Sequence, residues 1–372
     1  MVLKKLFLMF FLLRVILPGY AVDPAADDET ARLKEFSDPK TIWGRGVEGI
    51  IEEAYRRCFK TYIIGGKVMN LRMPFAQNNE RNELSEQDWE FVGGGKADPV
   101  LLWETIAEAL ETEDFKNYTA ALSDGWEKVI IFNIPQKTWT TSRDLFDIAR
   151  MKAGSYRGLP HRPYVLTSGK GIEDSDVYNY LYCVGWTGMD CSGFVWNVLS
   201  HIAAAGNLDL GQALRRAMGV PRGGDPSWYA GTSFYNSRST QISAVRDEIR
   251  SLKAGDILLF RGRNGQMVHS AIIQSIDFSA GLIRYLQSTD EAPLDERGVH
   301  DSYIRFDPSR DRLSLKDPSL VWTQSRYAPF PGEKSSAFSD DGQRFRAYPE
   351  SGGGRVVRLK LITGVIDKLP KK

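Results

Sequence analysis

The sequence is poor in the residues that usually carry covalent or metal chemistry, with three cysteines and four histidines among 372 residues. Cys183 and Cys191 have no second cysteine pair at ligand spacing, so we expect no metal site. Gly93-Gly94-Gly95-Lys96 lacks the spaced first glycine and the final hydroxyl residue of a phosphate-binding loop. The sequence therefore predicts a protein that works without a cofactor.

Charge of one sign and long apolar runs are also scarce. The 48 basic and 47 acidic residues give a formal net charge of +1. No basic helix or aromatic-basic repeat indicates nucleic-acid binding. The apolar run at 6–17 is too short to span a bilayer and contains Arg14. We expect neither a nucleic-acid partner nor a stable membrane anchor.

The N-terminus has the organisation of a secretory signal. Lys4 and Lys5 precede the apolar run, and Gly19-Tyr20-Ala21 is an acceptable small-residue cleavage site. We predict that residues 1–21 are a signal peptide. The protein would then be exported, to the periplasm or to the extracellular cell wall.

An exported protein can form disulfides, and an odd number of cysteines leaves at least one thiol free. A Cys58–Cys183 bond would leave Cys191 free, whereas a Cys183–Cys191 bond would block it. The sequence does not choose between these pairings.

Cys191 lies in the most informative stretch, Gly188-Met189-Asp190-Cys191-Ser192-Gly193-Phe194-Val195. Asp190 is a good N-cap, and apolar residues then recur at helical spacing up to the stop signal Gly206. Cys191 would begin this helix, where unpaired amides and the helix dipole favour a thiolate. A free cysteine can equally be a small buried hydrophobe, and the motif alone leaves both interpretations open.

A cysteine nucleophile needs a base. His201 lies ten residues further along the same predicted helix, about 15 Å from Cys191 at 1.5 Å per residue, and is excluded. His269 has a better context, because strands predicted at 257–260, 267–273 and 282–287 form an antiparallel meander. His300 falls in a segment predicted to be irregular, and we expect it to be exposed.

Taken together, these blocks resemble the NlpC family of bacterial cell-wall cysteine peptidases, which have a papain-like fold. That family carries an Asp-Cys-Ser-Gly-Phe signature, a Gly-Asp strand entry and a His-Val-Gly-Ile-type strand. The matching stretches here are 190–195, 252–260 and 269–273, in the same order. Pro163-Tyr164 resembles the Pro-Tyr element of the family, whose tyrosine lies beside the nucleophile.

The resemblance implies that Cys191 is the nucleophile and His269 its base. It also implies a polar residue on the next strand that orients the imidazole, and the candidate is Gln287. Strand alternation puts Tyr285 and Gln287 on the same face, and a glutamine amide can accept a hydrogen bond from the far ring N–H. We expect Tyr164, Asp190 and Ser192 to support the substrate or the oxyanion.

The predicted fold class is α+β, a papain-like NlpC-type domain whose cysteine-bearing helix packs on an antiparallel sheet, preceded by a mostly helical module. The expected boundaries are 22–140 for that module, 141–295 for the catalytic domain, and 296–372 for an irregular wrap with a final strand at 356–362 that completes the domain. Compared with the family pattern, insertions occupy 165–188 and 207–249.

The resemblance implies an exported cysteine hydrolase with peptidoglycan as its partner. It would cleave amide bonds in stem peptides, commonly between D-glutamate and the diamino acid, through a thioester. His269 is followed by Ser-Ala where the family usually has Val-Gly, and the longer hairpin from His269 to Gln287 is similar to that of CHAP amidases. The alternatives are therefore a CHAP-like amidase or acyltransferase on another substrate, and a catalytically inactive wall-binding protein.

Overall fold

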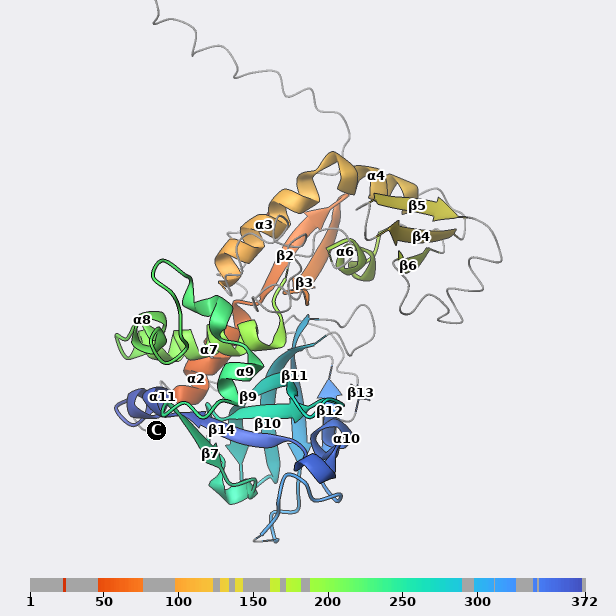
Figure 1. The fold of residues 1–372 in the computed structure, drawn as a ribbon. Helices are drawn as coiled ribbons and strands as arrows, with labels where there is room; N and C mark the ends of the chain where they lie inside the picture. Colours follow the sequence, from red (N-terminus) through yellow and green to blue (C-terminus); the bar gives the residue numbers. More distant parts are fainter. Residues whose placement is uncertain are drawn as a thin grey trace, which may run out of the picture.

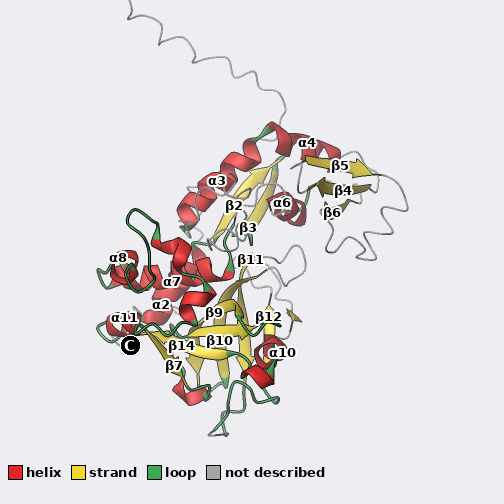
Figure 2. Ribbon diagram, viewed as in Figure 1, coloured by secondary structure: helices red, strands yellow, loops and turns green. Residues whose placement is uncertain are grey.

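The computed structural model describes residues 23–24, 46–75, 98–122, 128–133, 138–142, 161–167, 172–181, 188–289, 298–310, 312–325, 337–339 and 341–369. The predicted signal peptide lies outside these residues. Within them, helices and antiparallel sheets give an α+β protein (Figures 1 and 2). None of the described helices is both long and apolar enough to cross a membrane.

An eight-stranded antiparallel sheet runs through the lower part of the view in Figure 1. Its strands are β7 (Ile242–Val245), β8 (Ile257–Arg261), β9 (Met267–Asp277), β10 (Leu282–Thr289), β11 (Gly298–Arg305), β12 (Val321–Ser325), β13 (Ala337–Ser339) and β14 (Arg355–Leu359). Their order is β13-β12-β11-β10-β9-β8-β14-β7. The meander β8-β9-β10 confirms the three predicted strands.

Two helices cover one face of this sheet. α7 (Cys191–Ala205) packs against β9 and β10, and α2 (Val47–Arg56) packs against α7 and β9. The Asp190 side chain caps α7 by accepting from the Gly193 amide at 2.5 Å, and Gly206 occupies the C-cap. The sequence prediction of this helix and of both its ends is therefore confirmed.

The segment expected to be mostly helical is mixed. Besides α2 it contains α3 (Pro99–Glu111) and α4 (Glu113–Leu122), but also β1 (Asp23–Pro24), β2 (Phe59–Ile64), β3 (Lys67–Arg72), β4 (Lys128–Asn133) and β5 (Thr138–Ser142). The prediction missed β2 and β3, which form a hairpin directly after α2. Buried side chains of this segment, among them Tyr62 and Trp103, belong to the same hydrophobic core as α7.

The predicted insertions carry short elements. These are α6 (Asp174–Tyr180) in the first and α8 (Leu210–Leu214), η3 (Pro226–Tyr229), α9 (Thr232–Tyr235) and β7 in the second, followed by η4 (Ile249–Ser251). β6 (His161–Thr167) pairs with β4 in a separate sheet of order β5-β4-β6. The insertions therefore add both helices and an edge strand to the fold.

The segment after residue 295 is more regular than predicted. Besides β11 to β14 it contains α10 (Asp341–Arg346), η6 (Pro349–Ser351) and α11 (Lys360–Ile366). The strand expected at 356–362 joins the sheet between β8 and β7 but ends at Leu359, and α11 begins at Lys360. His300, expected to be exposed, lies in β11 with 0 % exposure.

Strand alternation separates two hydrophobic clusters on the two faces of the sheet. Ile272 and Leu286 belong to the cluster of α7, whereas Ile273 and Tyr285 belong to the cluster that contains Phe345 of α10. We call these the α7 face and the α10 face. α10 contacts β8 and β12 on its side of the sheet.

Candidate active site

Cys191 occupies the first position of α7. Its side chain is 8 % exposed, and its sulfur is not in a disulfide. Cys58 is likewise not in a disulfide, and burial raises the pKa of its thiol to about 12, so almost no thiolate forms there at neutral pH. Cys183 lies outside the described residues. Since neither Cys58 nor Cys191 is in a disulfide, neither of the two candidate pairings is formed in this structure.

The structure brings His269 and Gln287 together. The imidazole Nε2 lies 2.6 Å from Gln287 Oε1, although the two residues are 18 positions apart in sequence. Both are buried, with exposures of 4 % and 0 %. Tyr285 and Gln287 share a face as predicted, because the tyrosine hydroxyl and the Gln287 amide both donate to Asp341 Oδ2 at 2.8 Å.

The orientation of the Gln287 amide follows from its partners. Nε2 donates to Ser302 Oγ at 2.9 Å and to Asp341 Oδ2 at 2.8 Å. Both amide hydrogens are then used, and Oε1 faces the imidazole. Since a carbonyl oxygen only accepts, His269 must carry its proton on Nε2, and its Nδ1 holds the lone pair.

Burial is the main cause of a low pKa for His269, which falls to about 4. The positive charge of Arg344 lowers it further, while Asp341 and the hydrogen bond from Gln287 act in the opposite direction. At neutral pH the imidazole is therefore neutral and able to accept a proton.

Cys191 and His269 lie at the same end of the sheet. Ser288 Oγ, at the end of β10, donates to Met189 O at 2.6 Å, which ties the chain entering α7 to that edge. His269 lies near the beginning of the antiparallel neighbour β9. The body of α7, however, covers the face of Leu286, whereas His269 and Gln287 project on the α10 face. The imidazole and the body of α7 therefore lie on opposite faces of the sheet, and a thiol–imidazole contact would have to reach around this end of it.

The other predicted residues have different surroundings. Ser192 Oγ donates to both carboxylate oxygens of Asp190 at 3.1 and 3.2 Å, and the two side chains are 1 % and 2 % exposed. These hydrogen bonds, with the one from the Gly193 amide to Asp190, stabilise the first turn of α7. Tyr164 lies on β6, in the sheet β5-β4-β6 and not in the eight-stranded sheet; its side chain lies outside the described residues.

Sequence reasoning missed Asp341. This carboxylate begins α10, is 0 % exposed, and lies 54 positions beyond Gln287 in sequence. Its neighbour Arg344 donates to Oδ1 at 3.2 Å. No motif marks this position, because its partners come from strands far away along the chain.

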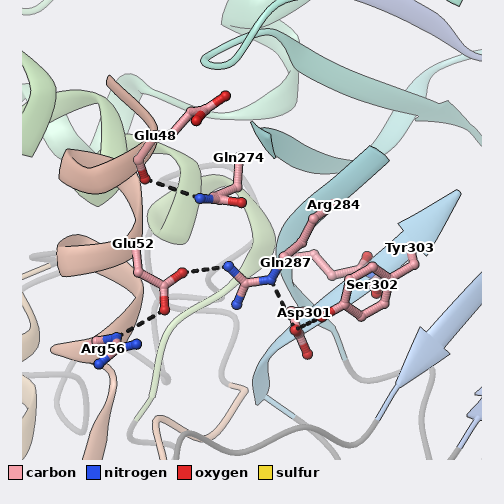
Figure 3. Close-up of polar contacts among 9 residues, drawn as sticks. All are labelled: Glu48, Glu52, Arg56, Gln274, Arg284, Gln287, Asp301, Ser302 and Tyr303. Atoms are coloured by element: carbon pink, nitrogen blue, oxygen red, sulfur yellow. Dashed lines mark hydrogen bonds and ion pairs between the residues drawn. The ribbon is translucent and has the colours of Figure 1, made fainter. Parts of the chain in front are cut away.

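A second polar cluster is buried on the α7 face (Figure 3). The guanidinium of Arg284 bonds to Glu52 of α2 and, through Nε, to Asp301 at 3.0 Å. Arg56 adds a second partner for Glu52 at 2.9 Å, and the Tyr303 hydroxyl donates to Asp301 at 2.7 Å. We call this set the Arg284 cluster; it ties α2 to β10 and β11.

Neither of two surface hollows formed by described residues is lined by Cys191 or His269. One, of about 300 Å³, lies between α11 and residues 252–256, and the other, of about 470 Å³, lies beside His201 and Asn197 on α7. Among the residues described, no three His, Cys, Asp or Glu side chains are grouped as metal ligands.

No model of a known protein family, no curated protein and no solved structure matches this chain. We therefore base the function on the cysteine motif and on the geometry above.

Proposed function

We propose that this protein is an exported cysteine hydrolase that cleaves amide bonds in the stem peptides of peptidoglycan, at the bond between D-glutamate and the diamino acid. The observation that carries the proposal is the 2.6 Å contact between His269 Nε2 and Gln287 Oε1, at the sheet end where Cys191 begins α7. The proposed nucleophile, base and orienting amide lie on three separate elements, α7, β9 and β10.

The order of the elements along the chain supports an NlpC-type, papain-like assignment for the same region. A helix that starts at the cysteine packs on an antiparallel meander whose second strand carries the histidine and whose third carries the amide. That order of elements agrees with the family resemblance of the sequence.

In the proposed reaction, His269 Nδ1 takes the proton of the Cys191 thiol, and the thiolate attacks the carbonyl carbon of the substrate amide. The imidazolium then gives this proton to the leaving amine as the C–N bond breaks, which leaves a thioester on Cys191. Water, deprotonated by His269, hydrolyses the thioester and restores the thiol. The backbone amide of Cys191, at the helix start, stabilises the oxyanion.

The decisive experiment is digestion of purified sacculi with analysis of the released fragments by mass. We expect Cys191→Ala and His269→Ala each to lower fragment release by about 10²–10⁴-fold. Cys58→Ala is the matched control, because Cys58 is also a buried cysteine outside any disulfide but lies just after α2. Equal release by wild type and Cys191→Ala would refute a cysteine nucleophile.

The fragment masses also separate the alternatives. Cleavage at the amide that joins the stem peptide to the glycan would indicate an amidase, and transfer to an added amine would indicate an acyltransferase. Sedimentation with insoluble wall without any cleavage would indicate a wall-binding protein.

The pairing of thiol and imidazole has its own test. The three-carbon reagent 1,3-dibromoacetone alkylates a thiol and then a nitrogen that lies beside it. We expect peptide mapping to find Cys191 linked to His269. Alkylation of Cys191 without that link would show that the two side chains do not meet around the sheet end.

A further inference from the structure

A single buried carboxylate, that of Asp341, holds the amide that faces His269. Its Oδ2 accepts from Gln287 Nε2 and from the Tyr285 hydroxyl, each at 2.8 Å, while Oδ1 accepts from Arg344 at 3.2 Å. Burial is the largest influence on its pKa and raises it, but Arg344, His269 and the donated hydrogen bonds outweigh burial and leave the pKa below its usual value. Asp341 is therefore an anion at neutral pH.

An ionised carboxylate carries no hydrogen, and this fact removes one of the two orientations of the Gln287 side chain. If the amide flipped, its oxygen would face Asp341 Oδ2 with no proton between them. The hydrogen bond from Nε2 to Asp341 would be lost, because the Ser302 hydroxyl can turn to donate to the amide oxygen but the carboxylate cannot, and a hydrogen bond that ends on a charged group is worth about 1.5–3 kcal/mol. The carboxylate thus keeps the amide NH₂ toward itself and Oε1 toward the imidazole.

Aromatic packing fixes the helix that carries this carboxylate. Phe345 is 0 % exposed and stacks on Trp322 with ring centroids 5.2 Å apart. It also meets the edge of Phe260 at 5.6 Å, and Phe260 in turn lies 5.1 Å from the His269 ring. α10 and the histidine therefore pack against the same phenylalanine, so the position of Asp341 is set relative to the ring it influences.

We propose that Asp341 is a positioning residue of the site. It locks the Gln287 amide in one orientation and, through it, the His269 tautomer that leaves Nδ1 free to take a proton. The role of that tautomer toward Cys191 rests on the proposed function, but the lock itself does not. Residues beyond 295 thereby complete the site rather than merely wrapping the domain.

The lock is measured directly by ¹⁵N spectra of the histidine-labelled full-length protein, in which protonated and bare ring nitrogens resonate far apart. The His269 signals are assigned by their loss in His269→Gln. We expect wild type to show the Nε2–H form alone and Asp341→Asn to show both tautomers, because an asparagine can present a donor or an acceptor to Gln287. Identical spectra for the two proteins would overturn the proposal.

The consequence for Cys191 is measured as the rate of its alkylation by iodoacetamide across pH, with each cysteine followed on its own peptide. This reading needs no substrate. We expect about a tenfold loss of rate in Asp341→Asn and in Gln287→Ala, and no further loss in the double variant, because Asp341 acts through Gln287. Additive losses would refute that route.

Asp301→Asn is the matched control. Asp301 is likewise 0 % exposed and accepts from a tyrosine hydroxyl and an arginine, but it belongs to the Arg284 cluster on the α7 face. We expect it to lower stability while leaving both the His269 tautomer and the alkylation profile unchanged. An equal change in both variants would assign the effect of Asp341 to general destabilisation. Should Asp341→Asn not fold, Tyr285→Phe, which removes one donor to Asp341, is read in the same two assays.

The outcomes distinguish the two proposals. If wild type leaves sacculi intact but Asp341→Asn shifts the His269 tautomer, the proposed hydrolase is refuted and the lock is retained. Cleaved sacculi without a tautomer shift would keep the hydrolase and refute the lock.

Discussion

The two faces of the eight-stranded sheet bury similar polar side chains in different arrangements. On the α7 face, Arg284 lies between the carboxylates of Glu52 and Asp301, so that opposite charges neutralise one another. On the α10 face, a neutral imidazole meets a neutral amide, and the carboxylate of Asp341 lies one residue further away. The charges of the first arrangement are paired, whereas the second leaves Nδ1 of His269 with a lone pair that can take a proton.

The pKa shifts of Glu52 and His269 illustrate this contrast between one group from each face. Burial would raise the pKa of Glu52, yet Arg284 and Arg56 lower it below its usual value, so this carboxylate stays charged. Burial also lowers the pKa of His269, and there the partners do not reverse the effect. We conclude that the α7 face uses charge to join α2 to the sheet, whereas the α10 face holds an imidazole that burial keeps neutral.

The largest effect should come from breaking the Arg284 cluster. Arg284→Met leaves the buried carboxylate of Asp301 without its cation and Glu52 with Arg56 alone, and removal of one partner of a buried pair costs about 3–5 kcal/mol. Urea denaturation measures this loss. Arg310→Met is the control: its pair with Asp317 is similar in length, but the arginine side chain is 46 % exposed, so we expect a change below about 1 kcal/mol. Equal changes in both variants would remove the distinction between the cluster and a surface pair.

A smaller effect should separate the faces by function. Tyr285→Phe removes a hydroxyl that donates to Asp341, and we expect a loss of about 1.5–3 kcal/mol in the free energy of unfolding. Tyr303→Phe removes the equivalent donor to Asp301 and should cost no more, since Tyr303 is only partly buried. Cys191 alkylation should slow in Tyr285→Phe alone. A slower rate in both variants would mean that the two faces are coupled.

The smallest effect concerns pH. The folded pKa of His269, about 4, lies below its ordinary value of 6.5, so the unfolded chain binds the proton first. The contribution to stability is complete above pH 6.5 and is lost as pH falls toward 4, at about 1.4 kcal/mol per pH unit. Between pH 6.5 and 5, wild type should lose about 1.6 kcal/mol more than His269→Gln in urea denaturation. Parallel curves would show that His269 titrates normally.

Much of the site could be predicted because its signals are local. The N-cap at Asp190, the helix from Cys191 to Gly206 and the shared face of Tyr285 and Gln287 each depend on residues within a few positions of one another. Asp341 and the burial of His300 could not be predicted, since both depend on which strands pair around them. The same reason explains the β2-β3 hairpin that was missed after α2.

The sequence by itself determined which polar side chains are present and on which elements: a cysteine at a capped helix start, a histidine on a meander strand, and an amide on the next strand. Those features arise from backbone hydrogen bonds and side-chain periodicity over short stretches. Only the tertiary structure decided which carboxylate stands behind the amide, which face of the sheet the imidazole occupies, and that α2 is bonded to a residue 232 positions away. Those choices depend on burial, because a buried polar group must find its partner wherever the chain brings one.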